Sequence, residues 1–219
     1  MHADLIDQLL EPAHGGGGLR GGRCWGVVIG IVTNNRDPDG LHRVKLRFPW
    51  LGAEDESNWA RVATPMAGPG RGFYALPEVD DEVLVAFDHG NVDHPYVVGS
   101  LWNGQDAPPE DNGNGSNDHR SLTSRSGHLL RLDDTNGSER IEIVDKTGNN
   151  RIVIDSSANG IRIEAQGDIE LTSSTGKVKI SAVGIELASQ AGVTVQAQTT
   201  LDLSAQAQAT LQGALVKVN

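Results

Sequence analysis

Hydrophobic residues in the first half of the chain alternate with polar residues in short runs, as in β-strands with one buried face. The run LHRVKLRFPW sets Val44, Leu46 and Phe48 against three basic residues. Comparable runs are WGVVIGIVTN, NWARVATPM, EVLVAFDHG and YVVGSLWNG, and turn formers such as those at residues 36–40 separate them. At least five short strands within residues 25–102 therefore predict a small closed barrel of the OB kind.

The chain on either side of this barrel has a different pattern. Residues 1–24 predict a leader, with a short helix over residues 3–11 and a flexible glycine-rich linker. Residues 103–120 contain almost nothing apolar and predict an exposed connector. Alternation returns in SGHLLRLDD and SERIEIVDK, so residues 121–150 predict a transitional pair of strands.

From Arg151 the sequence becomes a ladder, in which apolar pairs at i and i+2 recur about every eight residues through 151–219. The residues predicted to face inward are Ile152, Ile154, Ile161, Ile163, Ile169, Leu171, Val178, Ile180, Ile185, Leu187, Val193, Val195, Leu201, Leu203, Leu211, Val216 and Val218. The glycines predicted to form the turns of the repeat are Gly148, Gly160, Gly167, Gly176, Gly184 and Gly192.

One chain cannot enclose a core with this repeat, because each strand offers about two inward aliphatic side chains while ordering each residue costs about 1–2 kcal/mol. Three chains winding together would supply the missing walls and leave no long free edge. The predicted fold is all-β: an N-terminal OB-fold barrel followed by an intertwined homotrimeric triple-stranded β-helix needle. A single-chain parallel β-helix is the alternative, although its coils usually need about 20 or more residues per turn.

Composition supports this division of the chain. All nine aromatic residues lie at or before Trp102, so the second half lacks the large side chains on which an ordinary core depends. The net charge of −11, with no basic stretch, disfavours a nucleic-acid-binding protein. The single cysteine, Cys24, excludes an intramolecular disulfide framework and is expected to pack in or beside the first strand. No apolar run reaches the roughly 18 residues of a membrane-spanning helix, and the N-terminus does not resemble a signal peptide.

Three groups of residues are candidate chemical sites. The acids Glu78, Asp80, Asp81 and Glu82 are a conceivable glycosidase pair, but alternation at a strand entry, with Val79 and Val83 inward, accounts for them better. Asp88, His89, Asp93 and His94 are conceivable metal ligands, yet such residues are routine at a solvated hairpin tip. Ser126-Gly127-His128 fits a strand opening better than a nucleophile and base. We expect no catalytic residue, metal site or cofactor.

A family resemblance appears in Gly-Phe-Tyr at residues 72–74, Leu-Pro-Glu-Val-Asp-Asp-Glu-Val at 76–83 and Val-Gly-Ser-Leu-Trp-Asn-Gly at 98–104. In this order, and with the strands and ladder that follow, residues 25–219 resemble the VgrG and phage baseplate central spike family of contractile injection systems. The resemblance implies an OB-fold barrel crowned by a triple-stranded β-helix. It also implies a homotrimer that pierces the target envelope when the sheath contracts.

The resemblance also implies partners. About 24 residues precede the barrel where VgrG proteins carry a large hub, so the hub is expected to be a separate protein, as in phage tails, tailocins and extracellular injection systems; a type VI VgrG-like spike is the alternative. No histidine follows His128, so a PAAR-type tip protein is expected to cap the C-terminal end. Inner tube, sheath and baseplate proteins are indirect partners, and effector cargo is a further candidate. Assembly is expected in the cytoplasm, with transfer to the target envelope on firing. A spike-borne cell-wall-degrading enzyme is the competing hypothesis.

Overall fold

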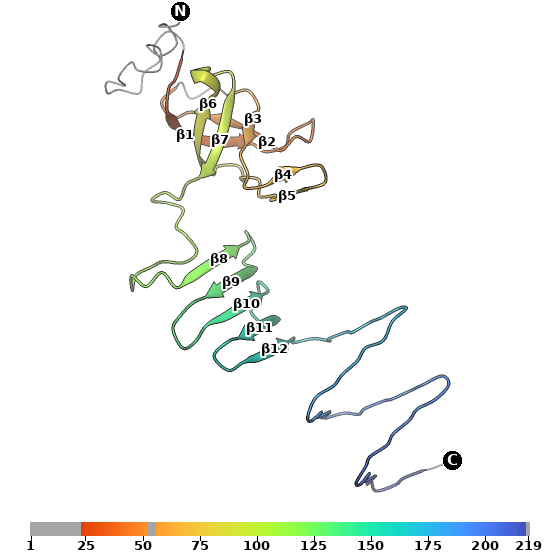
Figure 1. The fold of residues 1–219 in the computed structure, drawn as a ribbon. Coiled ribbons are helices and arrows are strands. Elements are labelled where there is room, and N and C mark those ends of the chain that lie inside the picture. The colour runs from red at the N-terminus through yellow and green to blue at the C-terminus, as the bar shows by residue number, and fades with distance from the viewer. Residues whose placement is uncertain (1–22, 52–55, 218–219) are drawn as a thin grey trace, which may run out of the picture.

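The computed structural model describes residues 23–51 and 56–217. A closed barrel is followed by a five-stranded sheet and then by an extended chain that runs back and forth (Figure 1). The helix and glycine run predicted in residues 1–22, and the inward position predicted for Val218, fall outside the described residues.

The barrel contains five strands, as the alternation in residues 25–102 predicts. They are β1 (Val27–Asn34), β2 (Arg43–Arg47), β3 (Ala60–Val62), β6 (Glu82–Phe87) and β7 (Pro95–Ser100). The barrel closes in the order β1-β2-β3-β7-β6, with β3 and β7 parallel and the other pairs antiparallel. The all-β fold with an OB-type barrel is therefore confirmed.

Aliphatic side chains from every barrel strand fill the interior. Val32, Val44, Leu46, Ala60, Val83, Val85 and Val97 are buried, and Phe48 packs against Phe87 with ring centroids 5.6 Å apart. Cys24 is also buried in this core, as expected, and burial raises the pKa of its thiol. At Gly30 an added Cβ would lie 3.1 Å from Val85 and 3.3 Å from Phe48, so a glycine lets β1 approach the core closely.

The loops of the barrel are short and locally bonded. Between β1 and β2, Asp37 accepts hydrogen bonds from Nε (2.8 Å) and Nη2 (2.7 Å) of the Arg43 guanidinium, which fixes the turn predicted at residues 36–40. Between β3 and β6 lies a small hairpin of β4 (Ala67–Gly68) and β5 (Arg71–Gly72). A short 3₁₀ turn, η1 (Asp88–Gly90), joins β6 to β7.

The second sheet is a meander of five antiparallel strands in chain order. They are β8 (His119–Thr123), β9 (Leu129–Asp133), β10 (Arg140–Val144), β11 (Arg151–Asp155) and β12 (Gly160–Glu164). Strand β8 begins inside residues 103–120, so strand structure starts before the end predicted for the connector. Its sequence, HRSLT, has one aliphatic residue and therefore gives a weak strand signal.

The chain enters the sheet from the barrel through residues 103–118. A salt bridge also joins the two parts, because Arg125 in the β8–β9 turn lies 3.0 Å from Glu78 of the barrel. Within the described ranges, no helix has the length and apolar character needed to cross a membrane.

Candidate assembly surface

The sheet β8–β12 has two chemically different faces. In its register Leu130 opposes Leu122 and Ile143, and Ile152 opposes Ile143 and Ile163, so these side chains share one face. We call this the apolar face; its aliphatic residues are Leu122, Leu130, Leu132, Ile141, Ile143, Ile152, Ile154, Ile161 and Ile163. They are 39–73% exposed, which is unusual for a continuous aliphatic surface of a folded protein.

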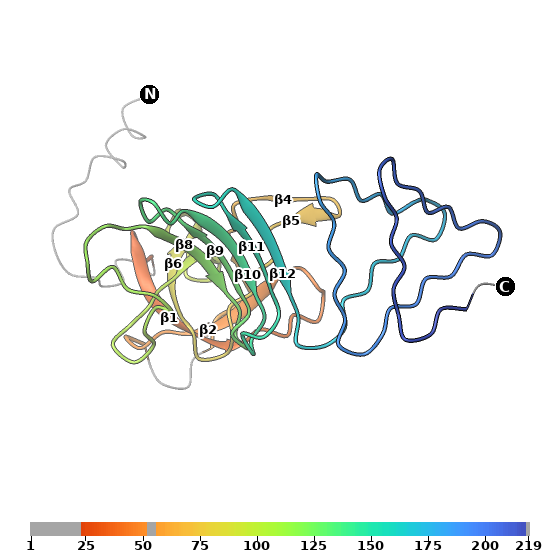
Figure 2. The same ribbon diagram turned by 90° about the horizontal axis from the view of Figure 1, so that it is seen from below.

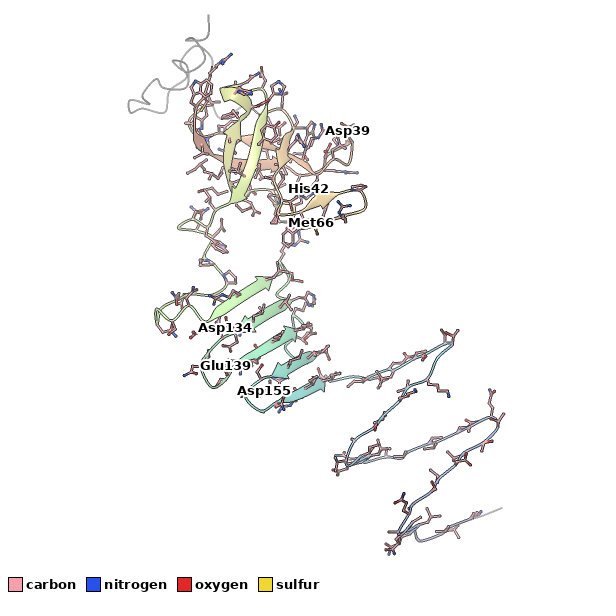
Figure 3. All side chains as sticks on the ribbon, in the orientation of Figure 1. Asp39, His42, Met66, Asp134, Glu139 and Asp155 are labelled. Atoms are coloured by element: carbon pink, nitrogen blue, oxygen red, sulfur yellow. The ribbon has the colours of Figure 1, made fainter. Side chains whose placement is uncertain are left out.

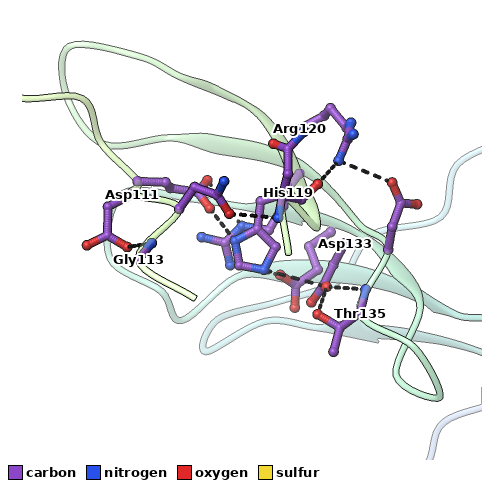
Figure 4. A network of polar contacts seen from close by, with 12 residues as sticks. Asp111, Gly113, His119, Arg120, Asp133 and Thr135 are labelled. Carbon is purple, nitrogen blue, oxygen red and sulfur yellow. Dashed lines mark hydrogen bonds and ion pairs between the residues drawn. The ribbon is translucent and has the colours of Figure 1, made fainter. Parts of the chain in front are cut away.

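The opposite face carries charges that pair with one another (Figure 4). Asp133, with a side chain only 4% exposed, lies 3.1 Å from Arg140, and Arg140 lies 3.0 Å from Glu142. Glu110, from the connector, lies 3.3 Å from Arg131 of β9. We call this set the charge cluster; its members are Glu110, His119, Arg131, Asp133, Arg140 and Glu142.

His119 lies between two carboxylates of the charge cluster. Its Nδ1 is 2.6 Å from Glu110 and its Nε2 is 3.5 Å from Asp133. The contact with Glu110 is short but is not aligned as a hydrogen bond. Both ring nitrogens of His119 thus face carboxylate oxygens. The connector is thereby held to the charged face of the sheet.

The carboxylates of the cluster are held in the ionised form. A hydrogen bond from Ser121 is the main cause that keeps the pKa of Glu110 below its usual value, and Arg131 and His119 add to it against the effect of burial. A hydrogen bond from Thr135 (2.6 Å) does the same for the pKa of Asp133, with Arg140 and His119 contributing. Glu110 and Asp133 therefore stay charged at neutral pH.

Beyond β12 the chain is extended and turns at regular intervals. Between residues 165 and 217 the described backbone forms no strand and no hydrogen bond between two backbone groups. The bends fall at residues 166–167, 174–176, 183, 190–191, 198–199, 206–207 and 214. They recur at intervals of seven to nine residues, close to the period of the apolar repeat. Figure 2 shows the same zigzag from a second direction.

The aliphatic pairs of the ladder lie on the straight segments between these bends. All sixteen predicted inward residues that the structure describes are exposed in the single chain, from 39% at Ile152 to 84% at Leu203. Their neighbours along the chain are polar or small, as in Glu170 between Ile169 and Leu171. The ladder thus presents aliphatic side chains and unpaired backbone groups together.

The structure differs from the sequence prediction at the first two ladder strands. Inside one chain β11 pairs with both β10 and β12, whereas the octad repeat predicted that every strand from Arg151 onward pairs with the other two chains. The turn 156–159 is short enough for a hairpin, which explains the local pairing. The apolar face also begins at Leu122, earlier than the predicted start at Ile152. The sequence shows alternation in residues 126–146, but alternation alone does not indicate which strands pair with one another.

The glycines of the repeat also differ from the simple expectation. Gly148 has φ +73°, a left-handed conformation that favours glycine. Gly160 is the first residue of β12, and at that turn Asn159 has the positive φ of 52° instead. Gly167 and Gly176 lie in bends, while Gly184 and Gly192 directly follow bends, all without a positive φ. Of the six glycines of the repeat, only Gly148 adopts the left-handed conformation that favours glycine.

The barrel acids form a structural turn. Asp81 accepts a hydrogen bond from the backbone amide of Glu78 (2.8 Å), and Asp80 has φ 76°. Val83 is fully buried as predicted, but Val79 is 47% exposed, so its predicted inward position is wrong. The turn conformation at Asp80 interrupts the alternation that the prediction assumed.

The other two candidate sites do not assemble. His89 lies 3.8 Å from Asp88, and among the described residues no group of three or more potential metal ligands converges. His128 Nδ1 accepts a hydrogen bond from the backbone amide of Lys146 (3.2 Å). Ser126 contacts Ser124 (3.4 Å) rather than His128. Ser126, Gly127 and His128 thus form the β8–β9 turn.

Comparison with known proteins gives the barrel a family. Residues 28–102 match the type VI secretion system and phage-baseplate injector OB domain. The match spans the five barrel strands from within β1 to just after β7. The OB assignment therefore rests on both the strand order and the family match.

Curated relatives extend the similarity to about half of the chain. The actin cross-linking toxin VgrG1 of Vibrio cholerae is 36% identical over 87 residues, 38% of this chain and 8% of the toxin. The type VI secretion system spike protein VgrG2a of Pseudomonas aeruginosa is 34% identical over 121 residues, 50% of this chain and 14% of the relative. VgrG1a of the same organism is 28% identical over 128 residues, 53% of this chain and 20% of the relative. The chain is thus a distant VgrG spike homologue that spans at most a fifth of these relatives.

Proposed function

We propose that the protein is the central spike of a contractile injection machine and works as a homotrimer. The observation that carries this proposal is the ladder. Its aliphatic pairs are exposed, and the 53 described residues 165–217 form no hydrogen bond between two backbone groups. Backbone groups in stable proteins are almost always paired or solvated. Two further copies would pair these groups and cover the aliphatic side chains at once.

Energetics favour this arrangement over a lone chain. Full burial of one Val, Leu or Ile side chain stabilises a protein by about 1.5–3 kcal/mol. The apolar face and the ladder together offer aliphatic residues at regular spacing along one direction, so their burial adds up along a rod. Three copies with the apolar faces inward would leave the charge clusters on the outer side of the trimer, where no further burial of charge is needed.

The spike role follows from the shape and chemistry such a trimer would have. Strands stacked about 4.8 Å apart would raise nine rungs by roughly 40 Å, giving a narrow rod with continuous hydrogen bonding. Residues 187–216 carry one charge, Asp202, and otherwise small or aliphatic side chains, which suits a slender point. A rod of this kind transmits force from a contracting sheath and needs no bond chemistry of its own.

The proposed surroundings are those of an injection particle. A separate hub protein would hold the OB end, and a PAAR-type tip protein would cap the exposed aliphatic end near Leu215 and Val216. Inner tube, sheath and baseplate proteins would contact the spike indirectly, and the tip is a candidate attachment point for effector cargo. Assembly would occur in the cytoplasm and the spike would reach the target envelope on firing.

The oligomeric state tests the trimer directly. Replacing Ile169 and Leu171 with Asp would place six charges in the interior of the trimer, so sedimentation should report loss of trimers. The matched control is Thr172→Asp, which adds a charge at the next outward position and should leave the trimer intact. A wild-type chain that sediments as a folded monomer, or a double variant that stays a heat-resistant trimer, would contradict the proposal.

Activity on cell walls separates a structural spike from an enzyme. We expect no clearing in a zymogram of the purified trimer on peptidoglycan, because the barrel acids form a turn and Ser126 is not bonded to His128. A cleared band at the mass of this chain would support the enzyme hypothesis instead. Electron microscopy of the same sample should show a wide head and a thin rod.

A further inference from the structure

The outward face of strands β2, β3 and β7 carries an array of basic and aromatic side chains. Arg43 of β2 lies directly opposite Arg61 of β3, and Arg61 in turn lies beside Tyr96 of β7. The adjacent residues Ala60 and Val97 are buried, so the array points away from the core. Like charges directly opposite each other weaken a pair of strands. The two arginines are therefore placed at a cost to the barrel.

A depression lies at this place on the barrel surface. Its volume is about 380 Å³ and its walls are Leu41, Arg43, Trp59 and Arg61. Leu41 is 63% exposed and Trp59 is partly exposed, so one side of the depression is apolar. The two guanidinium groups supply the polar side. This composition fits a ligand group in which a negative charge stands next to an apolar body.

Arg43 is fixed in the depression by the turn that precedes β2. Its Nε and Nη2 atoms donate hydrogen bonds to Asp37 (2.8 and 2.7 Å), and Nη2 also donates to Asp39 (2.6 Å). Figure 3 labels Asp39 in this turn. Among the described residues Nη1 donates no hydrogen bond, so its two N–H groups are available to another acceptor.

Arg61 has no acidic partner in the part of the chain that the structure describes. Its guanidinium carbon lies 5.7 Å from the centre of the Tyr96 ring. Stacking on a ring positions a guanidinium group without using its N–H donors. Residues directly opposite in antiparallel strands are about 5 Å apart at Cα. One carboxylate placed between Arg43 and Arg61 would therefore pair with both and offset their repulsion.

The aromatic rings of this face are themselves covered by cations. Arg43 and Lys45 lie 5.8 and 5.6 Å from the centre of the Trp59 ring. Proteins that bind single-stranded nucleic acids stack the bases on aromatic side chains, and here cations occupy those positions. The net charge of −11 also repels polyanions. A single carboxylate beside an apolar group avoids both conflicts.

We propose that this depression binds an acidic side chain of a partner protein, in a segment where apolar residues flank the acidic one. The carboxylate lies between Nη1 of Arg43 and the guanidinium group of Arg61, and the flanking apolar side chain covers Leu41 and Trp59. We call these four residues the carboxylate site. The site is built within one barrel, so it does not depend on the trimer of the proposed function.

Binding of a capped tripeptide to the full chain tests the site. The probe is acetyl-Leu-Glu-Leu-amide, whose only charge is the glutamate side chain, and the control is acetyl-Leu-Gln-Leu-amide. With 5-fluorotryptophan in the protein, ¹⁹F NMR follows all four tryptophans, and a Trp59→Phe variant assigns the signal of Trp59. The glutamate probe should shift this signal saturably and leave those of Trp25 and Trp102 in place. The glutamine control should shift none of them.

Two arginine variants locate the contact. Arg61→Gln should weaken binding of the glutamate probe about tenfold or more, because a hydrogen bond to a charged group is lost. Arg71→Gln removes the same charge from the hairpin β4–β5 and should bind like wild type. Unchanged signals of the other tryptophans show that each variant is folded. Equal weakening in both variants, an equal shift with the glutamine control, or no shift at Trp59 would each overturn the carboxylate site.

A nucleic-acid probe and sedimentation separate the remaining outcomes. Oligothymidylate should leave the Trp59 signal unchanged, and a shift that it causes while the glutamate probe causes none would overturn the proposal in favour of a nucleic-acid site. A trimer that does not bind the probe would overturn the carboxylate site alone. A monomer that binds it would overturn only the proposed trimer.

Discussion

The barrel and the ladder both alternate apolar and polar residues, yet their apolar side chains are covered to very different extents. In the barrel, Val32, Val44 and Leu46 are completely buried by other strands of the same chain. In the ladder, equivalent aliphatic residues such as Leu171 and Leu187 are more than 70% exposed. The sheet of the barrel closes on itself, whereas the zigzag of the ladder has no second layer of the same chain to cover its aliphatic side chains. Alternation alone thus predicts which side chains face inward but not which chain covers them.

The largest expected effect concerns the apolar face of the sheet, which leads into the ladder. Replacing Ile143 with Asp puts a charge on the apolar face, three charges in a trimer, and should abolish trimers as measured by sedimentation. The control Thr123→Asp adds the same charge on the opposite face and should sediment like wild type. Barrel fluorescence should be unchanged, since all four tryptophans lie at or before Trp102. A stable Ile143→Asp trimer would show that the apolar face from Leu122 to Ile143 lies outside the interior of the trimer.

A core truncation should break the barrel and spare the ladder. Leu46→Ala leaves a cavity in a fully buried site and should lower the free energy of unfolding of the barrel by about 2–5 kcal/mol. Denaturant titration followed by tryptophan fluorescence measures this, while sedimentation should still report trimers. Val98→Ala in β7 is the control, because Val98 is exposed and its truncation leaves no buried cavity. Equal losses in both regions would mean that barrel and ladder unfold as one unit.

A smaller effect is expected where the connector meets the sheet. Glu110→Gln removes the carboxylate that His119 and Arg131 hold, and should weaken docking of residues 103–118 by about 1 kcal/mol at neutral pH. The pKa of Glu110 is lower in the folded state than its ordinary value. The contribution of Glu110 to docking is therefore present at pH values above the ordinary pKa and is lost as the pH falls through the folded-state pKa. Hydrogen exchange of the connector should therefore differ between variant and wild type at pH 7 and converge in acid. A difference that persists in acid would contradict this assignment.

The smallest effect concerns one turn of the barrel. Asp37→Asn removes the carboxylate that pairs with Arg43, although Asp39 still contacts Arg43 at 2.6 Å. Arg43 holds the pKa of Asp37 well below its ordinary value, so the stabilisation is present above that ordinary value and lost as pH falls through the lowered one. Thermal unfolding of the barrel should occur at a lower temperature in the variant at neutral pH, and the two curves should approach each other in acid. An unchanged Tm at neutral pH would show that the contact of Asp39 with Arg43 is enough to hold this turn.

Much of the barrel could be predicted because its signals are local. Alternation around Leu46 and Val85 set the inward faces, and the glycine and proline turns set the strand ends. Strand β8 was missed because Leu122 is its only aliphatic residue. The charge cluster was missed because Glu110 and Glu142 are far apart in sequence, and no pattern indicates that they meet. Val79 was misplaced because the conformation of Asp80 breaks the alternation there.

The sequence by itself determined the strands of the barrel, the period of about eight in the ladder and the small number of aliphatic side chains that each repeat of the ladder offers. A strand repeats its side-chain direction every two residues, so these features follow from local order. Only the tertiary structure decided that β11 and β12 join the sheet of β8–β10 and that Glu110 is held on the charged face of that sheet. Such contacts depend on which distant segments meet, and that is fixed by long-range packing rather than by local pattern.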